Sequence, residues 1–139
     1  MNTTNITNSS ITSTGKRKNA TSCLIYNTEK YNSIIINDKP WKEFFPQFRH
    51  QLKILSPFVV TGLPVINNLK FKIMGGGVTA QAEATRHAIS KLLKIIHIDN
   101  PQIIKSLKEN KFLTRDPRKK ERNKPGQKGA RAQFNSKKR

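Results

Sequence analysis

The last 25 residues of the chain, 115–139, constrain its fold more than any other segment. They hold eleven lysines and arginines but only two acidic residues. Pro117, Pro125, Gly126 and Gly129 interrupt the segment, and both residue types disfavour a regular helix. We therefore expect an extended basic arm, residues 115–139, that becomes ordered along a partner rich in negative charge.

The charge of the whole chain points to the same kind of partner. Its 139 residues carry 27 Lys and Arg against 8 Asp and Glu, a net charge of +19, and nucleic acid is the commonest polyanion to offset such an excess. A membrane partner is not expected. The longest mostly apolar stretch, 54–66, is too short to span a bilayer and is broken by two prolines and a glycine.

Composition divides the chain into three parts. Residues 1–14 carry no charged side chain, and 11 of the 14 are Asn, Ser or Thr. Such a segment cannot bury a core, so a disordered N-terminal extension is predicted. It also lacks the pattern of a transit peptide or a secretory signal. Between it and the arm, residues 15–114 are enough for one modest hydrophobic core.

The pattern of residues 15–114 predicts an α+β domain of two layers, one sheet with helices on one face. Alternation of apolar side chains with lysines over 69–73 is typical of a half-buried strand. The predicted strands are 20–26, 31–36 and 69–73, and the predicted helices are 39–45, 48–55, 79–96 and 101–109.

Particular residues are expected to bound these helices. Pro40 suits the first position of the short helix 39–45, and Pro57 should stop the helix that follows it. Thr79 is a reasonable N-cap for the longest helix. Apolar residues at a spacing of four give that helix one buried face, and Ser90 falls on the opposite, polar face.

Gly75, Gly76 and Gly77 lie between a predicted strand and the longest helix. Three glycines can expose backbone N–H groups at a helix start, where the helix dipole favours an anion, so the turn could cradle a phosphate of an RNA backbone. A tight strand-to-helix turn is the simpler alternative, and both stay open. The spacing matches neither a Walker loop nor a dinucleotide-binding motif.

Two clusters of basic residues are candidate phosphate contacts. Lys16, Arg17 and Lys18 come just before the first predicted strand. In the arm, arginine can bind phosphate through two N–H groups and lysine supplies a point charge. Asp116 and Glu121 lie among these cations and are interpreted as their local partners. The arm's candidates are Arg115, Arg118, Lys119, Lys120, Arg122, Lys124, Lys128 and Arg131.

No set of residues predicts catalysis, a metal site or a cofactor. Cys23 is the only cysteine, and the three histidines are scattered. Paired carboxylates and a Ser/His/Asp or Cys/His arrangement are also lacking. We expect a protein that is not an enzyme and that takes no metal, no cofactor and no small-molecule substrate.

The order of residues in the arm resembles that of a known family, the universal small-subunit ribosomal protein number nine in its bacterial and organellar form. The resemblance covers about residues 15–139, and the arm is its most specific part. It rests on Leu113 through Arg118, Glu121-Arg122, Lys124-Pro125-Gly126 and Ala130-Arg131, on the glycine triplet with Gln81-Ala82 and Arg86-His87, and on Gly15, Arg17, Lys18 and Ala20.

The resemblance implies a fold and a set of partners. The domain would be like the second domain of small-subunit ribosomal protein five and would bind small-subunit rRNA in the head, beside neighbouring head proteins. Arg86 and the glycine triplet would be among its rRNA contacts, and the arm would thread through rRNA to the decoding region. Lys137, Lys138 and Arg139 would approach the anticodon arm of the peptidyl-site tRNA. Cys23 stands where the family has an arginine, which removes one expected rRNA contact.

Two further interpretations stay open. One is a free RNA chaperone or nonspecific nucleic-acid-binding protein. Such a protein would present stacking aromatics on an open sheet, whereas most aromatics here lie in apolar segments and are expected in the core: Phe44, Phe45, Phe48, Phe58 and Phe71. The high content of Ile (15), Asn (13) and Lys (19) is typical of an AT-rich gene. It favours an organelle-encoded protein of the mitochondrial ribosome, with the plastid stroma or the bacterial cytoplasm as alternatives.

Overall fold

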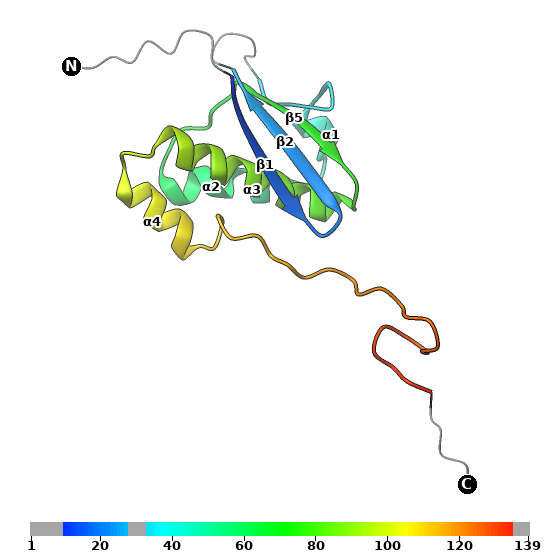
Figure 1. Ribbon diagram of the computed structural model, residues 1–139. Helices are drawn as coiled ribbons and strands as arrows, with labels where there is room; N and C mark the ends of the chain where they lie inside the picture. The colour runs from blue at the N-terminus through cyan, green and yellow to red at the C-terminus, as the bar shows by residue number, and fades with distance from the viewer. Residues whose placement is uncertain (1–9, 28–32, 135–139) are drawn as a thin grey trace, which may run out of the picture.

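The sheet is built around a hairpin near the N-terminus. In the computed structural model, which describes residues 10–27 and 33–134, β1 (Ile11–Arg17) and β2 (Ala20–Tyr26) pair antiparallel through a two-residue turn. β2 pairs antiparallel with β5 (Leu69–Met74), and β5 pairs parallel with the short β3 (Ile35–Ile36). With β4 (Lys39–Pro40) at one edge, the strand order is β1-β2-β5-β3-β4 (Figure 1).

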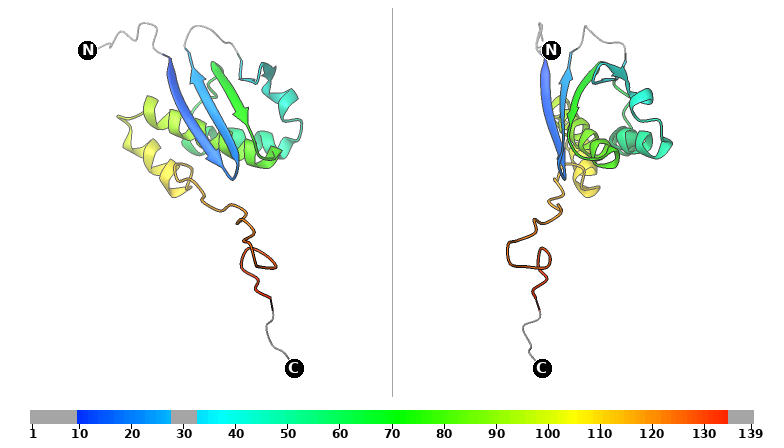
Figure 2. Two further views of the ribbon diagram at one scale, coloured as in Figure 1. Left: turned by 45° about the vertical axis from the view of Figure 1, so that its right-hand side comes forward. Right: turned by 90° about the vertical axis from the view of Figure 1, so that its right-hand side faces the viewer.

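The helices cover one face of this sheet and leave the other face open (Figure 2). They are α1 (Trp41–Phe44), α2 (Phe48–Thr61), α3 (Val78–Ile96) and α4 (Pro101–Glu109). α3 packs on β1 and β2, and α2 packs beside α3. The predicted α+β fold of two layers is therefore confirmed.

The core lies between the sheet and the helices. Its sheet side is formed by alternate residues of β2 and β5, such as Leu24 opposite Phe71, and its helix side includes Phe58 and Leu92. Each of these four side chains is at most 1% exposed. The intervening residues of β2 and β5 point to the open face, so the alternation predicted for 69–73 is confirmed.

The first strand was not expected. Residues 1–9 lie outside the described part of the chain, but Ile11–Arg17 forms β1, so the prediction of a disordered extension over 1–14 is wrong for 11–14. The segment is polar because it lies at an edge of the sheet, where Thr12 and Thr14 are exposed. Ser13 faces inward and donates a hydrogen bond to the carbonyl oxygen of Ala88 (2.7 Å).

Two predicted elements in the segment that precedes α2, a strand and a helix, are shorter in the structure than expected. Of the strand predicted over 31–36, the sheet contains Ile35–Ile36, while residues 31 and 32 lie outside the described part of the chain. The helix predicted over 39–45 is shorter. Lys39–Pro40 pairs with β3 as β4, and α1 begins at Trp41.

Pro57 does not stop α2, which continues to Thr61. A proline inside a helix leaves the carbonyl four residues earlier without its N–H donor. Here the Ser56 hydroxyl donates to that carbonyl, the one of Lys53, at 2.7 Å. The helix instead ends at Gly62, which adopts a left-handed conformation (φ 67°).

α3 differs from the prediction at its start and on its polar face. It begins at Val78 with Gly77 in the N-cap position, and the Thr79 hydroxyl lies 3.2 Å from Nε2 of His50 instead of capping the helix. Ser90, expected to be exposed, is buried and donates to the carbonyl of Arg86 (2.9 Å). Packing against both β1 and α2 buries more than one face of this helix.

Gly15 sets the distance between β1 and α3. A Cβ atom at this position would collide with the backbone carbonyl oxygen of Ala84 and the backbone nitrogen of Ala88. A change of side-chain rotamer could not relieve this clash, because it occurs at Cβ itself and the atoms it meets belong to the backbone of α3. Close packing of β1 on α3 therefore requires glycine.

We predict that Gly15→Ala lowers the free energy of unfolding by about 3 kcal/mol, because β1 must move away from α3. The matched control is Gly77→Ala, since no atom lies within 4 Å of the added Cβ and the φ angle of −98° suits alanine. Because Gly77 is the N-cap of α3, where alanine is less favourable than glycine, the control should cost at most about 1 kcal/mol. Urea unfolding followed by circular dichroism measures both. Equal effects of the two variants would contradict this account of β1 packing.

Candidate nucleic-acid interface

The start of the arm lies in a groove against the domain. The groove has a volume of about 540 Å³ and is open to solvent along one side. It is bounded by the end of β1, the first half of α3 and the segment after α4, and we call it the arm-root groove. Its lining residues are Lys16, Arg17, Glu83, Arg86, His87, Asn110, Lys111, Phe112, Thr114, Arg115, Asp116, Pro117 and Arg118.

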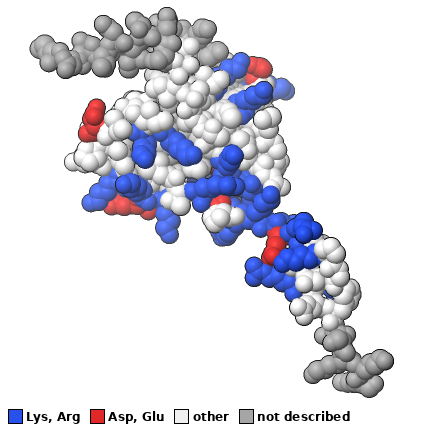
Figure 3. Space-filling view, viewed as in Figure 1, with Lys and Arg blue, Asp and Glu red and all other residues white. Residues whose placement is uncertain are grey.

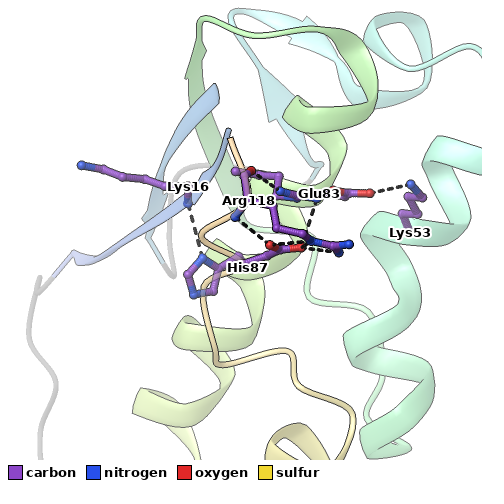
Figure 4. A network of polar contacts seen from close by, with 7 residues as sticks. Lys16, Lys53, Glu83, His87 and Arg118 are labelled. Carbon is purple, nitrogen blue, oxygen red and sulfur yellow. Dashed lines mark hydrogen bonds and ion pairs between the residues drawn. The ribbon is translucent and has the colours of Figure 1, made fainter. Parts of the chain in front are cut away.

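Glu83 of α3 joins two other elements at the wall of this groove (Figure 4). Its carboxylate accepts a hydrogen bond from Nε of Arg17 on β1 and another from Nζ of Lys53 on α2, each at 2.8 Å. Burial of the carboxylate opposes its ionisation. The hydrogen bonds and charges of Lys53 and Arg17 outweigh that effect and lower the pKa of Glu83.

Arg17 also holds the arm. Its Nη2 atom lies 3.1 Å from Oδ2 of Asp116, and its Nη1 atom donates a hydrogen bond to the carbonyl oxygen of Arg118 at 2.9 Å. Asp116 in turn accepts hydrogen bonds from the side chain and the backbone N–H of Arg118, which hold the pKa of its carboxyl well below the usual range. The Arg17 side chain is only 14% exposed, so its guanidinium is committed to the protein itself.

His87 links β1 to the segment just before the arm, and its contact with Lys16 is visible in Figure 4. Its Nδ1 accepts the backbone N–H of Lys16 (3.3 Å), and its Nε2 lies 3.2 Å from the carbonyl oxygen of Leu113. Only the neutral ring with a proton on Nε2 satisfies both partners. Burial and the positive charge of Lys91 lower the pKa of His87, which favours that neutral form.

Two residues that line the groove, Arg86 and Phe112, form a cation–π contact. The guanidinium carbon of Arg86 lies 4.9 Å from the centre of the Phe112 ring. This contact fixes the position of Arg86 while leaving its N–H groups available to a ligand. Among the predicted contacts of the groove, no ion pair within the described residues involves Lys16, Arg86 or Arg115.

The glycine turn has a structural explanation. Gly75 and Gly76 adopt left-handed conformations, with φ angles of 72° and 68°. A Cβ on Gly75 would lie 2.6 Å from the carbonyl oxygen of Asn19, and one on Gly76 would lie 2.9 Å from Cβ of Ala20. The turn thus packs tightly against the β1–β2 turn, which accounts for these two glycines without a ligand. The added phosphate contact stays a prediction.

The described part of the arm, 115–134, contains neither helix nor strand and leads away from the domain past the β1–β2 turn (Figure 1). Lysines and arginines gather on the neighbouring edge of the domain and along the arm (Figure 3). Glu121 accepts Nε of Arg131 (2.8 Å) and pairs with Lys124 (3.2 Å). The prediction that Asp116 and Glu121 act as local partners is confirmed. No described acidic group pairs with the arm residues Lys119, Lys120, Arg122 and Lys128.

The predicted phosphate contacts fall into two groups, cations with an acidic partner and cations without one in the described part of the chain. Arg17, Lys124 and Arg131 belong to the first group, because Arg17 pairs with Glu83 and the other two share Glu121. Lys18 at the β1–β2 turn belongs to the second. Lys137, Lys138 and Arg139 lie outside the described residues. Sequence reasoning missed Glu83, Lys53 and His87, because residues so far apart in sequence carry no local pattern that would join them.

No helix among the residues that the structure describes is both long and apolar enough to cross a bilayer. The histidine, cysteine and acidic side chains of this described part form no group of three that could hold a metal ion.

Comparisons with known proteins agree on one family. The family model described as "Ribosomal protein S9/S16" matches residues 15–139. The chain is 40% identical over 129 residues to "Small ribosomal subunit protein uS9" of Solidesulfovibrio magneticus and 43% identical over 129 residues to that of Maridesulfovibrio salexigens, covering 91% of this chain and 94% of each relative. The protein of the same name from Methylacidiphilum infernorum is 40% identical over 132 residues, 95% of this chain and 94% of that relative.

We predict that Glu83→Gln lowers the free energy of unfolding at pH 7 by about 2 kcal/mol, because Arg17 and Lys53 lose their carboxylate. The folded-state pKa of Glu83 is lowered, so its contribution is present above its ordinary pKa of 4.5 and is lost as the pH falls through the folded value. The difference between the two proteins should therefore stay constant from pH 7 down to about 4.5 and shrink as the pH falls further. Glu109→Gln, on the exposed side of α4, is the control. A difference independent of pH would contradict the ionic role of Glu83.

Proposed function

Since the chain belongs to the ribosomal protein S9/S16 family, we propose that its arm and arm-root groove bind the rRNA of the small ribosomal subunit through phosphate contacts. A structural role in the small ribosomal subunit follows from the family itself. The proposal of phosphate contacts rests on one observation: four cations of the arm have no acidic partner among the described residues. They are Lys119, Lys120, Arg122 and Lys128. Such cations release counterions when they meet phosphates, and this release drives binding.

The arm-root groove would give the arm a defined direction. Arg17, Asp116 and His87 fix residues 113–118 on the domain. Lys16, Arg86 and Arg115 line the same groove, and no acidic group in the described part of the chain forms an ion pair with them. An RNA backbone that enters the groove would meet these cations first and the arm next. Less conformational entropy is lost on binding when the root of an arm is already ordered.

The tip of the arm would reach beyond the rRNA. Arg139 lies 21 positions after Arg118, and a fully extended chain of that length spans at most about 70 Å. The Glu121–Arg131 pair brings together two residues ten positions apart and so shortens this reach. By resemblance to the family, we propose that Lys137, Lys138 and Arg139 contact the anticodon arm of the peptidyl-site tRNA. The proposed partners are thus small-subunit rRNA, that tRNA and neighbouring proteins of the subunit head.

The other functions receive less support. The open face of the sheet presents Thr21, Cys23 and Ile25 of β2, and Lys72 and Met74 of β5. These side chains offer no aromatic surface for stacking bases, as a free chaperone of single strands would need. The family is one of ribosomal structural proteins and not an enzyme family, and we propose that the chain has no catalytic activity.

The compartment is a separate proposal. The relatives named above are bacterial proteins, which fits the bacterial-cytoplasm alternative. The mitochondrial assignment rests on the Ile, Asn and Lys content alone. Fractionation of the native cells would decide between them.

We predict that changing Lys119, Lys120, Arg122 and Lys128 together to Gln weakens binding to a transcript of the small-subunit head rRNA. The slope of log K against log salt should become shallower by about 3, since each phosphate contact contributes about 0.7 to 0.9. The control changes four exposed lysines elsewhere to Gln, namely Lys42, Lys94, Lys105 and Lys108. It lowers the net charge equally. Filter binding over a range of salt measures both, and equal slopes for the two variants would contradict specific arm contacts.

We also predict that deleting residues 137–139 speeds dissociation of tRNA from the peptidyl site severalfold, while the shortened protein still enters the small subunit. The reason is that the domain and the rest of the arm keep their proposed rRNA contacts. Filter retention of labelled tRNA measures the dissociation rate, and sedimentation measures entry into the subunit. Failure of the shortened protein to enter subunits would contradict this division of labour.

A further inference from the structure

One side of α2 presents apolar side chains to solvent. Phe48 is 70% exposed, Leu52 51% and Val59 76%, and Leu55 is partly buried beside them. At about 100° per residue, these four positions lie within about 60° of one another around the helix axis. We call Phe48, Leu52, Leu55 and Val59 the α2 stripe. Phe48 was expected in the core, and the structure corrects that prediction.

Folding of the domain does not account for the α2 stripe. α2 already contributes a separate buried side to the core, which includes His50, Ile54 and Phe58. Phe48, Leu52 and Val59 lie on the opposite side of the helix and would be polar in an ordinary surface helix. A contiguous row of exposed apolar residues on a protein of such high charge marks an interaction surface.

The chemistry of the α2 stripe favours one kind of occupant. Three of the four side chains, Leu52, Leu55 and Val59, are aliphatic and gain little from a hydrated, charged RNA backbone, whose contacts come from cations and polar groups. Phe48 is the one aromatic ring of the stripe, whereas binding of single strands uses several stacking rings. A second copy of the chain would bring another net charge of +19 to the interface, and like charges oppose such association. An apolar surface on another protein would bury the stripe favourably.

The rim of the α2 stripe specifies the partner further. Arg49 is exposed one residue after Phe48, and no described acidic group pairs with it. Lys53, farther around the helix, is already bound to Glu83. A partner would therefore place a carboxylate beside Arg49 and apolar side chains over Leu52 and Val59.

We propose that the α2 stripe is the docking surface for another protein of the small subunit, through an apolar segment flanked by a carboxylate opposite Arg49. This inference rests on the proposed function, because it places the partner in the same particle. It adds a protein interface on α2 to the RNA contacts of the arm and the arm-root groove.

Photo-crosslinking within assembled small subunits tests the inference. p-Benzoylphenylalanine replaces Leu52 in one protein and Val59 in another, and it replaces the exposed Lys105 of α4 in the control. Mass spectrometry then identifies what is attached. We expect both stripe positions to crosslink to one ribosomal protein, at a peptide that contains Asp or Glu, with a yield at least fivefold above the control.

A second variant tests the charged rim. Arg49→Glu in the protein labelled at position 52 should lower the crosslink yield at least threefold, because the carboxylates would repel, and Lys105→Glu should leave it unchanged. Adducts to rRNA, to a second copy of the chain, or no yield above the control would overturn the inference while leaving the proposed function intact. Absence of the labelled and the unaltered chain from sedimented small subunits would overturn the proposed function, and the inference with it.

Discussion

The arrangement of this protein depends on the guanidinium group of Arg17. It contacts Glu83 on α3, Asp116 at the root of the arm and the carbonyl of Arg118. Three elements that are distant in sequence thus meet at one buried cation. Because Gly15 lets β1 lie directly on α3, the end of β1 delivers Arg17 to this position. Without that close packing, the acidic groups on α3 and in the arm would have no shared partner.

The few acidic residues of the chain divide its many cations into two populations. Three acidic residues, Glu83, Asp116 and Glu121, hold five of the cations in internal pairs, and these pairs shape the root and the middle of the arm. The paired cations are Arg17, Lys53, Arg118, Lys124 and Arg131. The cations left over, in the arm-root groove and farther along the arm, are available to phosphates. The anchor and the binding surface are therefore adjacent but chemically distinct, and an anchor substitution should act first on folding.

Much of the fold could be predicted from the sequence. Periodicity identified β5, α3 and α4, because those elements have one clearly apolar side. β2 was predicted from its strand-forming residue types and the turn residues after it. β1 was missed because an edge strand of Thr and Ser has the composition of a disordered segment. Pro57 gave a wrong helix end because its missing hydrogen bond is replaced by Ser56. Pairs such as Arg17 with Glu83 and Asp116 depend on tertiary packing, so composition could only suggest that the acids have basic neighbours.

The contacts of Arg17, Asp116 and His87 fix the root of the arm on the domain before any RNA binds. Backbone ¹⁵N relaxation of the free protein can detect this, because it reports motion residue by residue on the ps–ns timescale. We expect order parameters for residues 113–118 close to those of α3, about 0.85, with a fall below about 0.6 within the arm beyond residue 118. Low values that begin at residue 113 would contradict this expectation, because Arg17, Asp116 and His87 would then hold nothing in place.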